Sequence, residues 1–246
     1  YAIQQTFQTT ADDAYYGLGQ HQDDVYNYKN RQVFLFQNNT EVAVPFVISA
    51  KGYGILWDNY ALTTFGDTRP FRELNALGLY SKKGEKGWLT ATYSNDKTKP
   101  TDAILERAET KIDMEFLGQS KLALPAEFKP ENGVVTYEGK IASGFDGAHQ
   151  FRFTYGGYMK VWVDGKLVID RWRRAWNPAP ALVDVSMKKN VPIPFRLEWI
   201  PEGSESYLSL KWLEPLPQAL QNTFGFHSEA GQQLDYYFIH GQNMDS

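Results

Sequence analysis

The chain has 246 residues, no Cys, and a formal net charge of −4 from 25 Lys and Arg against 29 Asp and Glu. This length is enough for one large domain or two modest ones. The acidic balance excludes the basic surface typical of nucleic-acid-binding domains, so we expect no nucleic-acid partner. The lack of Cys excludes a disulfide scaffold, a thiolate metal site and a cysteine nucleophile.

Aromatic and turn-forming residues are frequent: 15 Tyr, 15 Phe and 7 Trp accompany 20 Gly and 12 Pro. This combination is typical of many short strands joined by tight turns. The longest uncharged apolar stretches, around Val42–Ile48 and Gly52–Trp57, are far shorter than the ~20 residues of a membrane helix. We therefore expect no membrane-spanning segment, and Tyr1–Thr10 shows no signal-peptide pattern.

Apolar and polar residues alternate with period 2 in several stretches, which predicts half-buried strands. In chain order these are Gln32–Phe36, Val134–Ile141, His149–Tyr155 and Phe195–Trp199. One segment, Thr101–Gly118, has apolar residues near a 3.6-residue period and is the only candidate helix. Its β-branched residues leave a strand open as the alternative.

The segment Met159–Asp170 gives the strongest local prediction, a β-hairpin. Asp164 and Gly165 stand between two alternating runs and suit the positive φ angles of a two-residue hairpin turn. The resulting register places Trp162 opposite Leu167 on one face, and Val161 opposite Val168 on the other.

Two changes in composition predict domain boundaries. The charged run Ser81–Gly87 precedes one compact β unit, residues 88–216, which ends at the two prolines of Glu214–Pro217. The tail contains a further strand pattern, Leu234–Ile239, which is too small to fold without an existing sheet. We therefore predict an all-β fold with two β-sandwich or barrel-like domains: residues 88–216 are inserted into a host formed by residues 1–83 and 218–246.

Common catalytic and metal-binding patterns are missing from the sequence. The four His lack metal-ligand spacing, and no GxSxG, P-loop or dinucleotide-binding motif occurs. The adjacent pairs Asp12-Asp13 and Asp23-Asp24 are interpreted as solvated turn residues rather than as the two carboxylates of a glycosidase. We expect no catalytic residue, no metal site and no cofactor in this chain.

The most unusual local cluster is Arg171–Pro178, which follows the hairpin and is interpreted as the start of a loop. Arg173 and Arg174 can donate multidentate hydrogen bonds, and Trp172 and Trp176 can offer flat apolar surface, a pairing suited to sugars, carboxylates or bases. The alternative is that these indoles, Trp172 above all, fill the core.

Two parts of the chain resemble known families. The host resembles the N-terminal β-sandwich of glycoside hydrolase family 31, particularly its α-xylosidases. The motifs that carry this resemblance are Tyr16–His21, Gln37–Thr40, Val44–Ser49, Lys51–Asn59 and the closing segment Gly225–Ser246. Residues 88–216 are similar to the protective-antigen-type carbohydrate-associated β module. Here the matching stretches are Tyr137–Ile141, Gly147–Phe151, the Val161–Gly165 hairpin and Asp170–Trp172.

The resemblance implies a non-catalytic N-terminal fragment of a retaining α-xylosidase or α-glucosidase, because the family's catalytic barrel has no counterpart here. Its implied partners are that barrel and a xyloglucan-type oligosaccharide, and the implied location of the parent protein is periplasmic, cell-surface or secreted. In the family a loop of this domain leans over the active-site mouth, and Asn38, Asn39, Thr40 and Glu41 match that loop. Calcium-dependent relatives of the module use a consecutive Asp pair, which residues 88–216 lack.

A second hypothesis from a different class stays open. The chain is then a free-standing carbohydrate-binding or adhesion protein without enzymatic activity, built from the same two folds.

Overall fold

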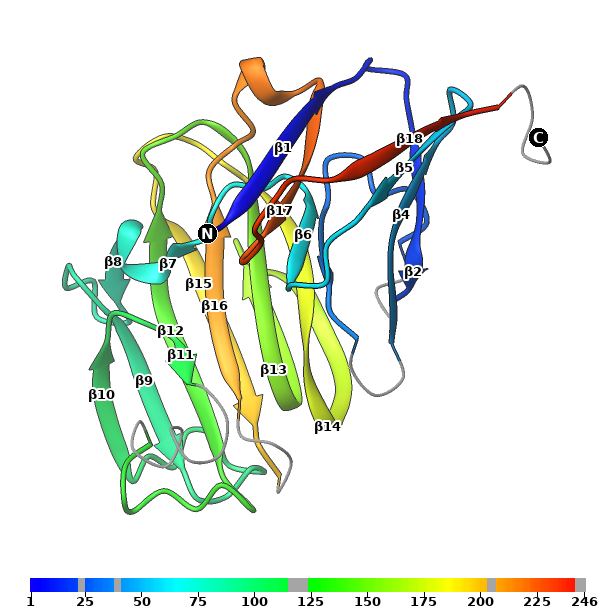
Figure 1. The fold of residues 1–246 in the computed structure, drawn as a ribbon. Coiled ribbons are helices and arrows are strands. Elements are labelled where there is room, and N and C mark those ends of the chain that lie inside the picture. Colours follow the sequence, from blue (N-terminus) through cyan, green and yellow to red (C-terminus); the bar gives the residue numbers. More distant parts are fainter. Residues whose placement is uncertain (22–24, 38–40, 115–123, 203–206, 242–246) are drawn as a thin grey trace. The chain divides into compact units, whose positions relative to one another are not determined.

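The computed structural model describes residues 1–21, 25–37, 41–114, 124–202 and 207–241, and the side chains of all of these except 172–179. Its elements are strands and two short 3₁₀ helices, which confirms the predicted all-β class (Figure 1). The chain divides into two compact units, residues 1–70 with 216–246 and residues 71–215.

The first unit is a β-sandwich of two four-stranded antiparallel sheets. The first sheet has the order β1-β17-β6-β3, with bounds Ile3–Gln8, Thr223–Ser228, Thr63–Gly66 and Gln32–Leu35. The second has the order β18-β5-β4-β2, with bounds Tyr236–His240, Tyr53–Trp57, Val42–Ser49 and Tyr15–Gln20. A 3₁₀ helix, η2, spans Gln218–Leu220.

Aromatic side chains from both sheets form the core of this sandwich. Trp57 of β5 stacks on Phe226 of β17 with ring centroids 5.2 Å apart, and Tyr15 of β2 packs on Phe224 at 4.5 Å. Both Trp57 and Phe226 are buried. Because strands from the two ends of the chain supply these rings, the sandwich closes only when the ends come together.

The second unit holds a sheet with the order β10-β9-β12-β15-β13-β16-β11. In that order the strands span Leu105–Glu109, Leu89–Ser94, Val134–Ala142, Ile193–Ile200, Gly147–Val163, Leu208–Leu213 and Asp113–Met114. Three further strands pair off this path: β7 (Arg72–Glu73) on β16, β8 (Gly78–Ser81) on β12 and β14 (Lys166–Met187) on β13. The 3₁₀ helix η1 spans Leu74–Ala76.

Strand β13 belongs to both halves of this sheet. Its first part pairs with β16 at Gln150–Tyr155, and its second part pairs with β15 at Tyr158–Val163. Between them, the buried Trp199 donates an indole hydrogen bond of 2.6 Å to the carbonyl oxygen of Gly156. A strand that changes partners at a bend is a common way to curl one sheet around a single core.

The predicted hairpin is present between β13 and β14. Asp164 and Gly165 have φ angles of 51° and 74°, as a type I′ turn requires, and Trp162 pairs with Leu167. The predicted partner of Val161 was wrong: a register irregularity between Val161 and Trp162 moves Val161 from Val168 to Ile169.

The segment 101–118 contains strands β10 and β11 in its described part, so the strand alternative holds there and the helix does not. Residues 71–83, which the sequence analysis placed in the host, group with the second unit, where β8 adds to β12 and β7 adds to β16.

The polypeptide enters and leaves the second unit at neighbouring positions. Glu73 pairs with Lys211 and Arg72 with Trp212, and the Arg72 guanidinium lies 2.8 Å from a Glu214 carboxylate oxygen. In the first unit the flanking strands β6 and β17 are also neighbours, with Gly66 opposite Gly225.

Candidate functional site

An open groove of about 800 Å³ lies on the solvent side of the second unit's sheet. Its lining comes from β12, β15 and β13 and from the loop after β8. The opposite faces of these strands carry Tyr137, Leu197 and Val161, which are buried in the core. The groove is therefore the polar side of a half-buried antiparallel sheet.

Cross-strand register aligns the groove side chains in two rows. Glu138, Arg196 and Trp162 are directly opposite one another, and the next row contains Glu198 and Lys160. Residues two apart on a strand share a face, so the rows form one surface. Acidic and basic groups alternate along it, and Trp162 is the half-buried aromatic among them.

Arg196 is held in place from three sides. One guanidinium nitrogen lies 3.6 Å from a Glu138 carboxylate oxygen, and another donates to Glu198. The guanidinium carbon also lies 5.3 Å from the centre of the Trp162 ring, a cation–π distance. On the outer row, Lys160 Nζ lies 3.5 Å from an Asp170 carboxylate oxygen. These contacts orient the indole and the charged groups of the floor.

The loop that follows β8 forms one wall of the groove. β8 pairs with β12 next to the floor, where Ser81 stands opposite Gly139. This pairing brings Lys82 and Lys83 to the rim, and Lys82 forms an ion pair with Glu106 of β10. The wall and the floor thus come from segments more than 50 positions apart.

The predicted cluster at Arg171–Trp176 lies on β14, so the expected loop is a strand. Within the described residues β14 pairs only with β13, and an edge strand tolerates Pro178 and Pro180 because its free side needs no ladder hydrogen bond. Arg171 is exposed, whereas the side chains of Trp172, Arg173, Arg174 and Trp176 lie outside the described residues.

Of the predicted host-loop residues, Asn38, Asn39 and Thr40 also lie outside the described residues. Glu41 is half-buried immediately before β4. Both clusters therefore stay predictions.

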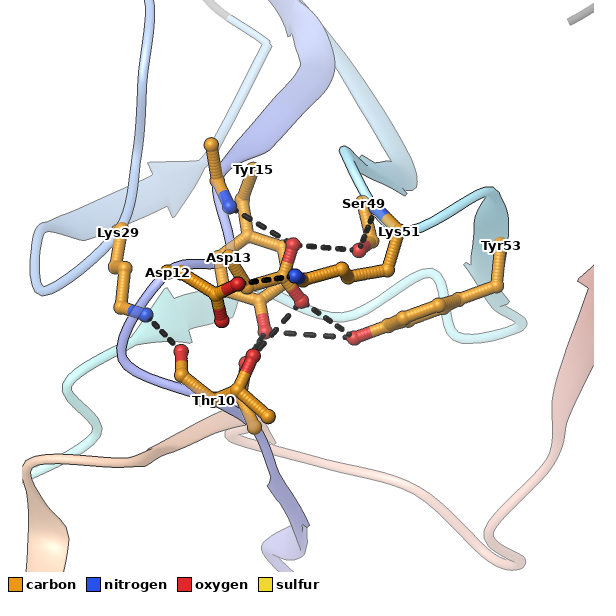
Figure 2. Close-up of polar contacts among 10 residues, drawn as sticks. Thr10, Asp12, Asp13, Tyr15, Lys29, Ser49, Lys51 and Tyr53 are labelled. Carbon is orange, nitrogen blue, oxygen red and sulfur yellow. Dashed lines mark hydrogen bonds and ion pairs between the residues drawn. The ribbon is translucent and has the colours of Figure 1, made fainter.

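The prediction that Asp12 and Asp13 are both solvated is wrong for Asp13. Asp13 is buried, whereas Asp12 is exposed. Its carboxylate accepts hydrogen bonds from Ser49 Oγ at 2.7 Å, from the Ala14 amide at 2.8 Å, and from Tyr53 OH and Thr9 Oγ1 at 3.2 Å each. Figure 2 shows this convergence beside the Asp12–Lys51 ion pair.

The electrostatics of this cluster indicate a structural role. Burial alone would raise the pKa of Asp13, but the hydrogen bonds from Ser49 and the Ala14 amide hold it below its ordinary value. Burial raises the pKa of the neighbouring Tyr15 phenol well above its ordinary range. A carboxylate with four donors ties the segment before β2 to β4 and β5, and has no spare acceptor for a substrate proton.

The second sheet of the first unit has an apolar outer face. Register places the members of this face opposite one another on β2, β4, β5 and β18: they are Tyr16, Phe46, Ile48, Leu56, Tyr237 and Ile239. Tyr237 is 57% exposed and Ile239 is 47% exposed. The Phe46 ring lies across Gly54, where a Cβ would meet it at 2.7 Å. We call this surface the apolar sheet face.

The described part of the chain offers neither a metal-binding cluster nor a membrane-spanning helix. No three His, Asp or Glu side chains lie close enough together to hold a metal ion. No helix there is long and apolar enough to cross a membrane.

Sequence reasoning missed the groove, although it placed Trp162 correctly opposite Leu167. The available signal was the hairpin register, which directs Trp162 to the face away from Val161 and hence toward solvent. Its charged neighbours on β12 and β15 follow only from the strand order.

Comparison with known proteins gives two family matches. Residues 84–218 match the PA14 domain, and residues 1–66 match the glycosyl hydrolase 31 N-terminal galactose mutarotase-like domain. An α-xylosidase from Saccharolobus solfataricus is 37% identical over 95 residues, which are 35% of this chain and 12% of that protein.

Solved structures agree with these matches. The chain is similar to a family 31 α-xylosidase from Xanthomonas citri, with a TM-score of 0.88 and 38% identity over 98% of this chain and 26% of that one. A β-glucosidase from Kluyveromyces marxianus shares the fold over 62% of this chain and 20% of its own, with a TM-score of 0.50 and 13% identity. The chain thus spans about a quarter or less of these enzymes. The chain belongs to the PA14 domain family, and its residues 1–66 match the glycosyl hydrolase 31 N-terminal galactose mutarotase-like domain.

Proposed function

We propose that the chain is the non-catalytic N-terminal part of an α-xylosidase-type glycoside hydrolase that acts on xyloglucan-type oligosaccharides. The observation that carries this proposal is the similarity to the Xanthomonas citri α-xylosidase, which runs through both units at 38% identity. An accessory region of this kind holds no nucleophile and no proton donor. Its contribution is to support the catalytic domain and to extend the surface that meets the substrate.

The apolar sheet face supports a role within a larger enzyme. An antiparallel sheet that faces water normally alternates apolar and polar residues, so that its outer face is polar. Here Tyr237, Leu56 and Phe46 form one apolar row, and Ile239, Gly54 and Ile48 form the next. A contiguous exposed apolar patch typically marks a contact surface. We assign this face to contact with the remainder of the glycosidase.

The test compares this chain with the protein encoded by its complete reading frame. We expect the complete protein to release xylose from xyloglucan oligosaccharides and to hydrolyse an aryl α-xyloside faster than an aryl α-glucoside. We expect the purified chain alone to hydrolyse neither, because retaining hydrolysis requires a nucleophile and an acid/base residue.

Two results would overturn the proposal. One is turnover by the chain alone that a single Asp or Glu substitution abolishes. The other is a complete protein that binds sugars but has no hydrolytic activity, which would favour the free-standing carbohydrate-binding or adhesion protein.

A further inference from the structure

We propose that the groove on β12, β15 and β13 is a binding site for a neutral oligosaccharide, centred on Trp162. This inference rests on the proposed function, since it names the part of the PA14 domain that meets the sugar. It does not use the predicted cluster at Arg171–Trp176, whose side chains from residue 172 onward lie outside the described residues.

The size and composition of the groove suit a saccharide. Its volume of about 800 Å³ lies within the range of roughly 300–1,000 Å³ that is usual for ligand sites. A pyranose ring presents an apolar C–H face, for which a partly exposed indole is a suitable stacking partner. Trp162 is such an indole, and the cation–π contact with Arg196 fixes its position before any ligand arrives.

The groove lining holds more basic than acidic residues, but most of the basic ones are held in ion pairs, which favours a neutral ligand. The basic residues are Lys82, Lys83, Lys140, Lys160 and Arg196, of which Lys82, Lys160 and Arg196 pair with carboxylates. Glu138 and Glu198 flank Arg196, and Lys160 stands beside Glu198 in the register. A hydroxyl both donates and accepts, so neighbouring hydroxyls of a sugar can use carboxylate acceptors and cationic donors at once. An anionic ligand would be attracted to the lysines but repelled by the carboxylates of Glu138 and Glu198, because like charges at close range repel.

The floor is also preorganised. The groove carboxylates hold Arg196 by ion pairs, and Asp170 lies beside Lys160 in the same way. Side chains that are already held in place lose less conformational entropy on binding, which favours affinity in a shallow site. The hairpin turn at Asp164-Gly165 fixes the register that places Trp162 in this row.

The experiment is calorimetric titration of the intact chain with xyloglucan oligosaccharides, and with an oligogalacturonate as the anionic probe. We expect the neutral sugars to bind, and Trp162→Ala to weaken that binding by about fivefold or more, as truncation of an anchoring aromatic does. Phe145→Ala, at an exposed aromatic position of the same unit outside the groove lining, is the matched control and should bind like the wild type. Trp162→Phe should retain part of the affinity, and thermal unfolding of each variant checks its fold.

Each other outcome overturns the inference. If the wild type and Trp162→Ala bind the oligosaccharides equally well, the groove is not the binding site. The same conclusion follows if only Trp176→Ala loses affinity, and the site would then lie on the predicted cluster. Preferential, salt-sensitive binding of the oligogalacturonate refutes the neutral ligand class. No binding of either probe refutes the groove as a site, while the proposed function is decided separately by the hydrolysis assay on the complete protein.

Discussion

The indole nitrogen of Trp57 donates a hydrogen bond of 2.9 Å to the hydroxyl oxygen of Ser228, 171 positions further along the chain. The Ser228 hydroxyl in turn lies 2.6 Å from Thr63 Oγ1, and both residues are buried. One small polar network therefore links β5 to β6 and β17 inside the sandwich. It ties the segment before the PA14 domain to the segment after it.

Removing the Ser228 hydroxyl should destabilise the first unit. Ser228→Ala leaves the buried Trp57 N–H without its acceptor, which typically costs about 1–3 kcal/mol. We expect a lower transition temperature for this unit in differential scanning calorimetry. The control is Ser186→Ala at an exposed position of β14, which should leave both transitions where they are. If Ser228→Ala leaves the transition temperature of the first unit unchanged, the hydrogen bond from Trp57 to Ser228 contributes nothing to stability.

Deleting residues 230–246 should destabilise the first unit and spare the second. The deletion removes β18, which pairs with β5, together with Tyr236 and Phe238, whose rings stack on Trp57 and Tyr53. The hydrophobic core of the second unit is a separate cluster formed by residues 74–212. Limited proteolysis should therefore cut the first unit and leave a resistant PA14 domain. A host that stayed resistant would contradict the structural role given to β18.

Acid should destabilise the first unit through Asp13. Its pKa is lowered in the folded chain from 3.8, so the stabilisation is complete above about pH 4 and is lost as the pH falls through the folded-state value. Asp13→Asn should lower the stability at neutral pH and flatten this acid dependence in urea unfolding between pH 5 and about pH 2. Asp58→Asn, at an exposed position of the same unit, is the control. If the free energy of unfolding falls with acid in the same way for the wild type and for Asp13→Asn, Asp13 does not cause the acid sensitivity of the first unit.

A second pH effect is expected in the PA14 domain. His149 is buried, its Nδ1 lies 3.0 Å from the Gly147 carbonyl oxygen, and its Nε2 lies 2.6 Å from Ser143 Oγ. The carbonyl can only accept, so Nδ1 donates to it and Nε2 accepts from the serine. Burial lowers the pKa of this imidazole from 6.5, because the charged form is poorly solvated there.

The sign of this effect follows from proton linkage. Below about pH 6.5 the unfolded chain binds a proton at His149 that the folded chain does not, so stability falls with falling pH until the folded-state pKa is passed. His149→Gln should reduce that slope in thermal unfolding of the PA14 domain between pH 7 and about pH 5. His240→Gln, at an exposed position of β18, is the matched control. A slope that persists in His149→Gln would assign the dependence to other groups.

Local chemistry made part of this fold predictable. The Asp164-Gly165 turn was predicted because two adjacent positive φ angles restrict the residue types that fit. The partner of Val161 was not predicted correctly. The register shifts between Val161 and Trp162, and the hairpin sequence alone does not show where such a shift occurs. The segment Arg171–Pro178 was mistaken for a loop because it follows the hairpin. It is part of strand β14, and Pro178 is compatible with an edge strand although it would break a central one.

The candidate site was less predictable, because distant residues create it. Asp13 is buried through hydrogen bonds from Ser49 and Tyr53, which lie 36 and 40 positions away. Glu138, Arg196 and Trp162 become neighbours only through the strand order β12-β15-β13. The alternation of polar and apolar residues along each strand shows which side chains can face solvent. It does not show that these three side chains lie next to one another.

The neighbouring ends of the PA14 domain have a consequence for the order of folding. To pair β6 with β17, an unstructured insert of this length would have to close a very long loop, and the entropic cost of closure rises with loop length. Once the insert has folded, β7 lies beside β16, and the Arg72–Glu214 ion pair holds its two ends together. For the host, the insert then acts as a short connection between two adjacent strands. We therefore expect the PA14 domain to fold first and the β-sandwich of the first unit to form afterwards. Mutations that slow the folding of the PA14 domain should then also delay the folding of the first unit.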